Sequence, residues 1–112
     1  MTRQDLMIPR RLAIHILHAA QSAKPQSIAG EIAQRNGTPA AFILDGQALP
    51  EGHAHWADLR SEPNRQAVPS ADELTPDRRL ILVSLDTKGV LQMRGWELHQ
   101  GQPQERVLKI IE

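Results

Sequence analysis

Four residues in the middle of the chain carry groups that could do chemistry at a fixed spacing. Arg60 and Glu62 are two positions apart, seven residues separate Glu62 from Ser70, and Glu73 follows Ser70 by three positions. A guanidinium can donate paired hydrogen bonds to carboxylates, so Arg60 could form a salt bridge with Glu62 or Glu73. The alternative is that these are solvated loop residues, whose pairing contributes less than about 1 kcal/mol.

Ser70 and Glu73 also have the spacing of a capping box. In that motif the serine side chain accepts a hydrogen bond from the Glu73 amide, and the Glu73 carboxylate accepts one from the Ser70 amide. A short helical turn is then expected from Ala71 to about Pro76. Residues 63–69 contain two prolines and are predicted to form a loop.

Two histidines offer a different candidate site. A strand over residues 53–59 would place His53 and His55 on one face, as two metal ligands require. Glu62 or Asp72 could add an oxygen ligand, which would give a weak candidate metal site. The separation of His-Ala-His from Ser70 does not match the seven-residue spacing that Glu62 has.

Covalent catalysis has few candidates in this sequence. The chain has no cysteine, which excludes a thiolate nucleophile and any cysteine-based metal site. A serine hydrolase would need Ser27, Ser61 or Ser70 beside a histidine. None of the three lies in the glycine pattern of a nucleophile elbow, and turn and cap roles account for them.

The elements that must position these residues follow from apolar patterning. A helix is predicted from about Pro9 to Ala23, and a hairpin over Ile28–Leu44 with its turn at Asn36-Gly37. In the strand over residues 53–59, Ala57 and Leu59 should share the histidine face, with Trp56 on the other.

The second half of the chain predicts three strands. Leu80–Leu85 has the continuous apolar character of a central strand buried on both faces, and Asp86–Gly89 should turn the chain into Val90–Leu98. After a turn over Gln100–Pro103, Val107–Ile111 should close the sheet. We therefore expect an α+β or α/β domain with a mixed, mainly antiparallel sheet.

Composition limits the remaining possibilities. The 112 residues, 40% of them apolar, suit a single domain spanning residues 1–112. Thirteen basic and thirteen acidic side chains cancel, so no overall field attracts nucleic acid or an anionic membrane. No stretch approaches a signal peptide or the roughly 20 apolar residues of a membrane span, and a cytoplasmic protein is expected.

The spacing of the first motif and several flanking segments resemble the JAMM (JAB/MPN, Mov34) metalloisopeptidase family. Its signature runs His, any residue, His, seven residues, Ser, two residues, Asp. Ile8-Pro9-Arg10-Arg11-Leu12 resembles the start of the family's first helix, Ser27-Ile28-Ala29-Gly30 its Glu-x-Cys-Gly-like strand, and residues 80–98 the strand pair of small bacterial members. The resemblance covers most of the chain and implies the family's cytidine-deaminase-like layered domain, with an N-terminal helix and a short second helix.

The resemblance also implies a degenerate active site. In the family, two histidines and an aspartate hold zinc, and a glutamate takes a proton from the zinc-bound water. Arg60, Glu62 and Glu73 stand in the three ligand positions here and Ser27 in the base position, while Ser70 keeps the family residue. We therefore expect no catalytic residue, metal ligand or cofactor, with the Arg60 guanidinium replacing zinc as the local positive charge.

The expected function is that of an inactive family member, a pseudoenzyme acting as a protein-binding or scaffold module. Its partners would be a ubiquitin-like sulfur carrier, the enzyme that activates the carrier, or an active homologue; nucleic acid and membranes are not expected. The alternative is a zinc metallopeptidase with rearranged ligands, drawn from His53, His55 and Glu62. A homodimer formed by pairing of an exposed edge strand is a third possibility.

Overall fold

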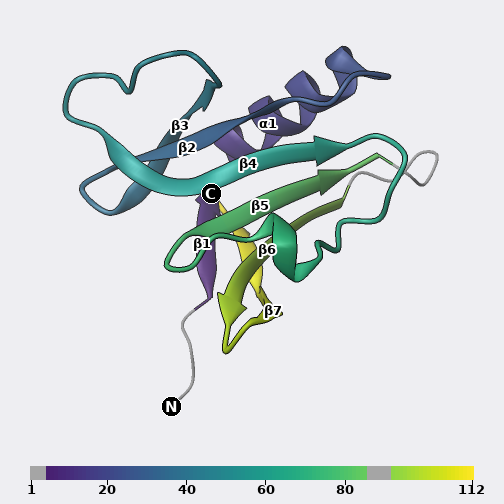
Figure 1. The fold of residues 1–112 in the computed structure, drawn as a ribbon. Helices are drawn as coiled ribbons and strands as arrows, with labels where there is room; N and C mark the ends of the chain where they lie inside the picture. Colours follow the sequence, from purple (N-terminus) through teal and green to yellow (C-terminus); the bar gives the residue numbers. More distant parts are fainter. Residues whose placement is uncertain (1–4, 86–91) are drawn as a thin grey trace.

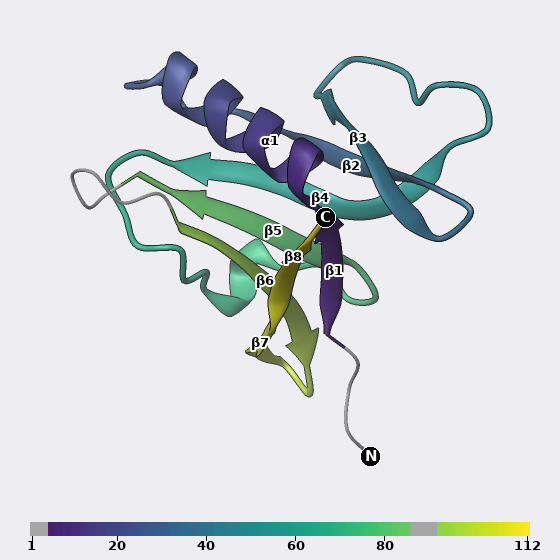
Figure 2. The same cartoon turned by 180° about the vertical axis from the view of Figure 1, so that it is seen from behind.

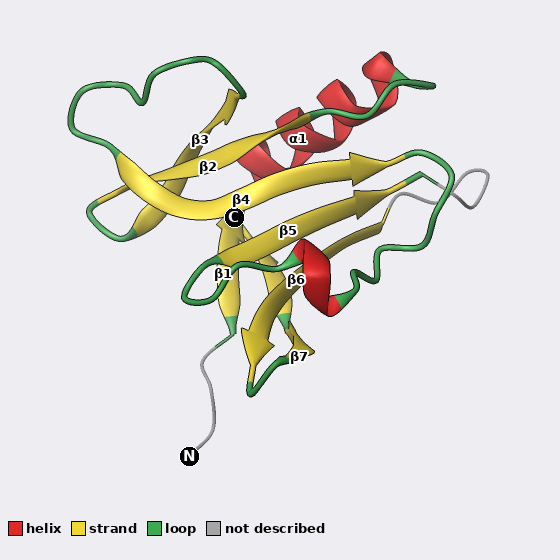
Figure 3. Ribbon diagram, viewed as in Figure 1, coloured by secondary structure: helices red, strands yellow, loops and turns green. Residues whose placement is uncertain are grey.

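A six-stranded sheet forms the centre of the molecule (Figures 1 and 3). The computed structural model describes residues 5–85 and 92–112. The strand order is β3-β2-β4-β5-β6-β7, and every neighbouring pair is antiparallel except β4 and β5, which are parallel. The predicted mixed, mainly antiparallel α+β domain is therefore confirmed. The strands are β2 (Ala29–Arg35), β3 (Thr38–Leu44), β4 (Ala54–Glu62), β5 (Arg79–Ser84), β6 (Gln92–His99) and β7 (Gln102–Arg106).

The helix α1 (Arg10–Ala23) covers one face of the sheet (Figure 2). Its buried residues recur at helical spacing and pack with β2, β4 and β5 in the larger core cluster: Leu12, Ala13, Ile16 and Ala20. The predicted helix is confirmed, with Pro9 as its N-cap residue. At 14 residues, α1 does not meet the length and apolarity of a membrane-crossing helix, nor does any other helix in the described residues.

Two short strands on the α1 side of the sheet differ from the prediction. β1 (Leu6–Pro9) pairs in parallel with β8 (Leu108–Ile111) as a separate two-stranded sheet (Figure 2). The prediction that residues 107–111 close the main sheet was therefore wrong. β7 occupies that edge instead, joined to β6 by a tight turn in which Gln100 and Gly101 both have positive φ.

The central strand β5 is buried on both faces, as its apolar run predicted. Ile81 and Val83 belong to the core under α1, whereas Leu80 and Leu82 belong to a smaller core on the opposite face. The connection between β4 and β5 covers that second face. The indole N–H of Trp96 donates to the Ala67 carbonyl at 2.9 Å and ties this connection to the sheet.

The β2–β3 hairpin was predicted correctly. Its turn lies at Asn36-Gly37, where both residues have positive φ. The position of Gly30 in β2 has no room for a side chain, because a Cβ added there would lie 2.0 Å from the Ile43 carbonyl oxygen in β3. The predicted turn over residues 86–89 and the first residues of the predicted strand from Val90 lie outside the described residues.

A bulge in β4 corrects the prediction for the histidine strand. Ile32 pairs with Ala57 and the next residue, Ala33, pairs with His55, so Trp56 is an extra residue in β4. Trp56 therefore packs against the core under α1, on the same side as Ala57. His55 contacts Glu31 on the opposite face. The predicted common face of His53, His55, Ala57 and Leu59 was wrong because a bulge reverses the alternation of side chains.

Candidate functional site

The end of β4 carries the residues that the spacing singled out. Arg60 and Glu62, expected in or near a loop, are the last outward-facing residues of this strand. Ser61 between them is fully buried on the opposite face. Alternation along the strand thus directs Arg60 and Glu62 toward the face that the β4–β5 connection covers. The 3-10 helix η1 (Ala71–Glu73) lies in that connection, as the short helix in Figure 3 shows. It brings Glu73 within ion-pair distance of Arg60.

Arg60 joins the two carboxylates, as the sequence had suggested. Its Nε donates to Glu62 Oε1 at 3.1 Å, and its Nη2 donates to Glu73 Oε2. The second oxygen of Glu73 accepts from Arg65 Nη2 at 3.0 Å. The exposed fractions of the Arg60, Glu62 and Glu73 side chains are 30%, 15% and 21%, so all three are partly screened from water. We call Arg60, Glu62, Arg65 and Glu73 the Arg60 cluster.

The cluster keeps Glu73 ionised. Partial burial of the Glu73 carboxyl raises its pKa, but this effect is outweighed. The hydrogen bond from Arg65, the charges of Arg60 and Arg65, and the Ser70 backbone N–H together lower the pKa of Glu73 below its usual range. Two guanidiniums and two carboxylates therefore form a neutral, internally paired group.

The predicted capping box is present only in part. The Ser70 hydroxyl donates to Glu73 Oε1 at 3.3 Å instead of accepting from the Glu73 amide, which donates to the Ser70 backbone carbonyl at 3.1 Å. η1 is also shorter than the turn predicted over residues 71–76. Because the Glu73 carboxylate is drawn to Arg60 and Arg65, Ser70 supports the ion pair and makes no side-chain cap.

Ser27 lies beside the cluster because of how β2 meets β4. The Ile28 amide donates to the Ser61 side-chain oxygen at 2.8 Å, and the Ser61 amide donates to the Ile28 carbonyl at 2.9 Å. This antiparallel pairing continues the β2–β4 register and places Ser27 level with Glu62. The four positions singled out in the sequence, Ser27, Arg60, Glu62 and Glu73, therefore come from three segments and meet at one end of the sheet.

The histidines lie elsewhere. His53 Nδ1 is 3.1 Å from the Glu51 carbonyl oxygen, in an exposed turn. His55 Nδ1 is 2.5 Å from Glu31 Oε2, toward the opposite end of β4 from Glu62. No three His, Asp or Glu side chains in residues 5–85 and 92–112 converge as metal ligands would. His53, His55 and Glu62 are thus not brought together.

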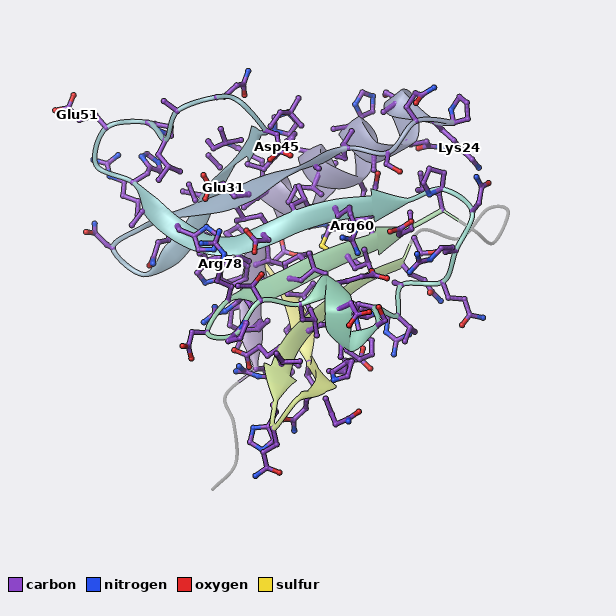
Figure 4. The ribbon with its side chains drawn as sticks, viewed as in Figure 1. Lys24, Glu31, Asp45, Glu51, Arg60 and Arg78 are labelled. Carbon is purple, nitrogen blue, oxygen red and sulfur yellow. The ribbon has the colours of Figure 1, made fainter. Side chains whose placement is uncertain are left out.

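A shallow hollow of about 240 Å³ separates the Arg60 cluster from a second ion pair. Arg78 donates to both oxygens of Asp58, at 3.0 and 2.6 Å, on the far side of the hollow from Arg60 (Figure 4). Gly30 and Leu74 also line it. Asp58, Arg65 and Arg78 were not predicted as site residues, because none of them stands at a recognisable spacing from a partner.

Comparison with known proteins identifies the fold. No family model matches the chain, and neither does any curated protein. A JAB1/MPN domain protein from Archaeoglobus fulgidus is 20% identical, with a TM-score of 0.67 over 92% of this chain and 98% of that one. A structure described as JAMM, a metalloprotease-like zinc site in the proteasome and signalosome, is 20% identical, with a TM-score of 0.71 over 97% of this chain and 100% of that one. The chain has the JAB1/MPN fold. A protein from Desulfitobacterium hafniense superimposes with a TM-score of 0.78 at 15% identity, over 96% of this chain and 93% of that one.

The residues at the Arg60 cluster do not fit the zinc that this fold can hold. A guanidinium has five donors and no lone pair to offer a metal, and its charge repels a dication. The two carboxylates at the ligand positions, Glu62 and Glu73, already accept hydrogen bonds from Arg60. The arrangement is that of a salt-bridged cluster, and no catalytic step through a metal follows from it.

Proposed function

We propose that this chain is a non-catalytic JAB1/MPN-fold domain that acts as a protein-binding or scaffold module. The observation that carries the proposal is the Arg60 guanidinium, which joins Glu62 and Glu73 at the place where the resemblance expects zinc. The guanidinium replaces the metal as the positive charge that holds β4 and η1 together. In this proposal the Arg60 cluster stabilises the fold and takes part in no catalytic reaction.

Two features, one at Ser27 and one at the Arg60 cluster, support the proposed lack of catalysis. A catalytic zinc site needs an open coordination position for water, and the water needs a general base nearby. The side chain in the base position is Ser27, a hydroxyl that stays protonated at neutral pH. The four charges of the Arg60 cluster cancel in pairs, so the cluster has no net field to attract a cation.

Metal content tests this proposal. The protein is purified without chelators, dialysed against zinc and then buffer, and measured by inductively coupled plasma mass spectrometry. We expect the wild type to hold far less than one zinc per chain. A matched variant restores the family residues, Ser27→Glu, Arg60→His, Glu62→His and Glu73→Asp, and we expect it to retain zinc when circular dichroism shows that it is folded.

The same measurement decides the alternative, a zinc metallopeptidase with rearranged ligands. Near-stoichiometric zinc in the wild type, lost in His53→Ala/His55→Ala, would overturn the non-catalytic proposal. Isopeptidase assays would then be the next step. The structure favours neither histidine as a ligand, since His53 and His55 face different partners.

The partner in this proposal is a protein. Candidates are a ubiquitin-like sulfur carrier, its activating enzyme or an active homologue, and the binding surface would be the open hollow between Arg60 and Arg78. Isothermal titration with a purified carrier tests this, using Arg78→Glu to reverse an exposed charge at the hollow and Arg10→Glu as a control on another face. Equal affinity for both variants would place the contact elsewhere. A homodimer through the edge strands β3 or β7 would appear in sedimentation velocity runs of the protein alone.

A further inference from the structure

A second hollow, of about 380 Å³, lies at the end of the sheet where β4 and β5 begin. Residues of the β2–β3 turn, of β1 and of β8 line it, and it is open to solvent on one side. Its lining includes two arginines, one carboxylate, an aromatic ring and two apolar side chains: Arg79, Arg106, Asp5, Trp56, Met7 and Ile111. It shares no lining residue with the hollow beside Arg60. The size is at the lower end of the range for small-molecule sites, roughly 300–1,000 Å³.

Arg79 is the central charge of this hollow. Its guanidinium carbon lies 5.1 Å from the centre of the Trp56 ring, so one face of the guanidinium stacks on the aromatic side chain. Burial lowers the pKa of Arg79; the nearby Glu97 carboxylate opposes this, and the positive charge of Arg106 adds to it. Glu97 is itself hydrogen-bonded by Arg106 at 2.5 Å. Two guanidiniums therefore share one carboxylate, and the charge of Arg79 is incompletely compensated.

The same chain contains a compensated counterpart. Arg94 lies 5.0 Å from the centre of the Trp96 ring, almost the stacking distance of Arg79 on Trp56. Arg94, however, donates to both oxygens of Glu105, at 2.7 and 2.6 Å. That forked hydrogen bond raises the pKa of Arg94, opposite to the change at Arg79. The two arginines stack on tryptophans at nearly the same distance, but Arg79 is more buried and lacks the dedicated carboxylate that Arg94 has in Glu105.

The ion pairs around this hollow indicate the charge of the ligand that would bind beside Arg79. Asp5, the carboxylate in the lining, is paired with Lys109 at 2.9 Å, and Glu97 is paired with Arg106. Among the residues that the structure describes, Arg79 thus forms no ion pair with a carboxylate of its own, which favours an anionic ligand.

The apolar side chains that line the hollow indicate that the ligand also has an apolar part. Met7 and Ile111 are 44% and 38% exposed, and with Trp56 they give the hollow an apolar side. We propose that this hollow binds a small organic oxyanion, a carboxylate or phosphate monoester on an aromatic or aliphatic body, with Arg79 as its anion-binding residue. The edge of the Arg79 guanidinium binds the oxyanion, while Trp56, Met7 and Ile111 cover the apolar body.

The two tryptophans allow the proposal to be tested within one sample. In a proton–nitrogen correlation spectrum, the indole N–H of Trp56 reports on the hollow and that of Trp96 serves as an internal reference; Trp56→Phe assigns the two signals. The probes are benzoate, phenyl phosphate, inorganic phosphate and benzyl alcohol. We expect saturable shifts of the Trp56 signal with benzoate or phenyl phosphate, and much weaker ones with inorganic phosphate or benzyl alcohol. The better of the first two probes identifies the head group.

Variants identify the residue responsible. Arg79→Gln should raise the dissociation constant at least about tenfold, as expected for loss of charge-assisted hydrogen bonds. Arg94→Gln, the matched arginine on the other tryptophan, should leave it unchanged. Ile111→Glu, at an exposed position near the end of β8, should also weaken binding by placing a carboxylate in the hollow, and it covers the case in which Arg79→Gln fails to fold.

Three results would overturn the proposal. These are no saturable Trp56 shift up to about 10 mM of any probe, equal affinity in wild type, Arg79→Gln and Ile111→Glu, or inorganic phosphate binding as tightly as phenyl phosphate. The last result would show an anion site with no organic specificity. None of these outcomes affects the metal measurement, so this proposal and the proposed function can fail separately.

Discussion

Replacing Arg60 by methionine removes the charge of the Arg60 cluster and keeps most of the side-chain length. In the wild type the Glu62 and Glu73 side chains are only 15% and 21% exposed. Arg60→Met removes the guanidinium that both carboxylates share, and Glu73 keeps its contact with Arg65. Exposed ion pairs contribute about 0–1 kcal/mol, and breaking a buried pair costs about 3–5 kcal/mol. Partial exposure places Arg60→Met between these limits, and we expect a loss of about 2 kcal/mol in the free energy of unfolding.

Thermal and urea unfolding followed by circular dichroism at pH 7 measure this loss. For a domain of this size, about 1 kcal/mol lowers Tm by roughly 4 °C, so Arg60→Met should melt about 8 °C below the wild type. The control is Arg10→Met, whose partner Glu112 lies 3.0 Å away but whose side chain and that of Glu112 are 63% and 88% exposed. We expect that control to stay within about 1 °C of the wild type.

A second substitution separates two causes of the loss. Glu73 keeps its hydrogen bond from Arg65 at 3.0 Å, so Glu62 is the carboxylate that loses its partner. If that loss causes the cost, Arg60→Met/Glu62→Gln should be more stable than Arg60→Met alone, despite carrying one more change. A melting temperature for Arg60→Met within about 1 °C of the wild type would refute the reasoning. It would mean that the cluster is no more than a set of solvated surface charges.

Three further perturbations test the fold around the site. Gly30→Ala should destabilise the domain by at least about 3 kcal/mol in urea unfolding, because its Cβ would lie 2.0 Å from the Ile43 carbonyl oxygen. A soluble variant with an unchanged urea midpoint would contradict this close approach. Ser61→Ala leaves the Ile28 amide without the acceptor at 2.8 Å and should cost about 1–3 kcal/mol, measured in the same way; a loss below about 0.5 kcal/mol would count against that hydrogen bond. Folding lowers the pKa of Glu73, so its ionised carboxylate stabilises the native state above the ordinary pKa of about 4.3, and this contribution is lost as pH falls through the lower native value. Urea midpoints from pH 7 to pH 3 should therefore fall less steeply for Glu73→Gln than for the wild type, and parallel curves would exclude the effect.

Local signals in the sequence predicted the parts of the fold that depend on neighbouring residues. The helix over Arg10–Ala23 follows from its apolar spacing, the β2–β3 turn from Asn36-Gly37, and the central position of β5 from its unbroken apolar run. The β1–β8 pair could not be found in this way. Its strands have four residues each and lie about a hundred positions apart, and neither is long enough to show a period. β7 was missed because Gln102–Arg106 contains a proline and four polar residues and so lacks an apolar alternation.

In the candidate site, too, contacts that depend on local spacing were predicted, and contacts that depend on strand pairing or loop path were not. The spacing of Arg60, Glu62 and Glu73 predicted their ion pairs, because β4 fixes the first two and η1 presents the third. The face of His55 could not be predicted, since the bulge at Trp56 is visible only in the pairing of β4 with β2. Arg65 was missed for a related reason, because its contact with Glu73 depends on the path of an irregular loop.

The two ends of the sheet differ in how their arginines are neutralised, and this difference argues for different roles. Arg60 and Arg65 face two carboxylates of their own, so their cluster gains nothing by binding a further ion and serves best as a fixed connection between β4 and η1. Arg79 shares Glu97 with Arg106, so no carboxylate of its own offsets the desolvation of its partly buried charge. An anionic ligand would stabilise this partly buried guanidinium by supplying the carboxylate or phosphate that Arg79 lacks. Under the two proposals, the paired charges of the Arg60 cluster connect β4 to η1, and the opposite end of the sheet binds a small anion through Arg79.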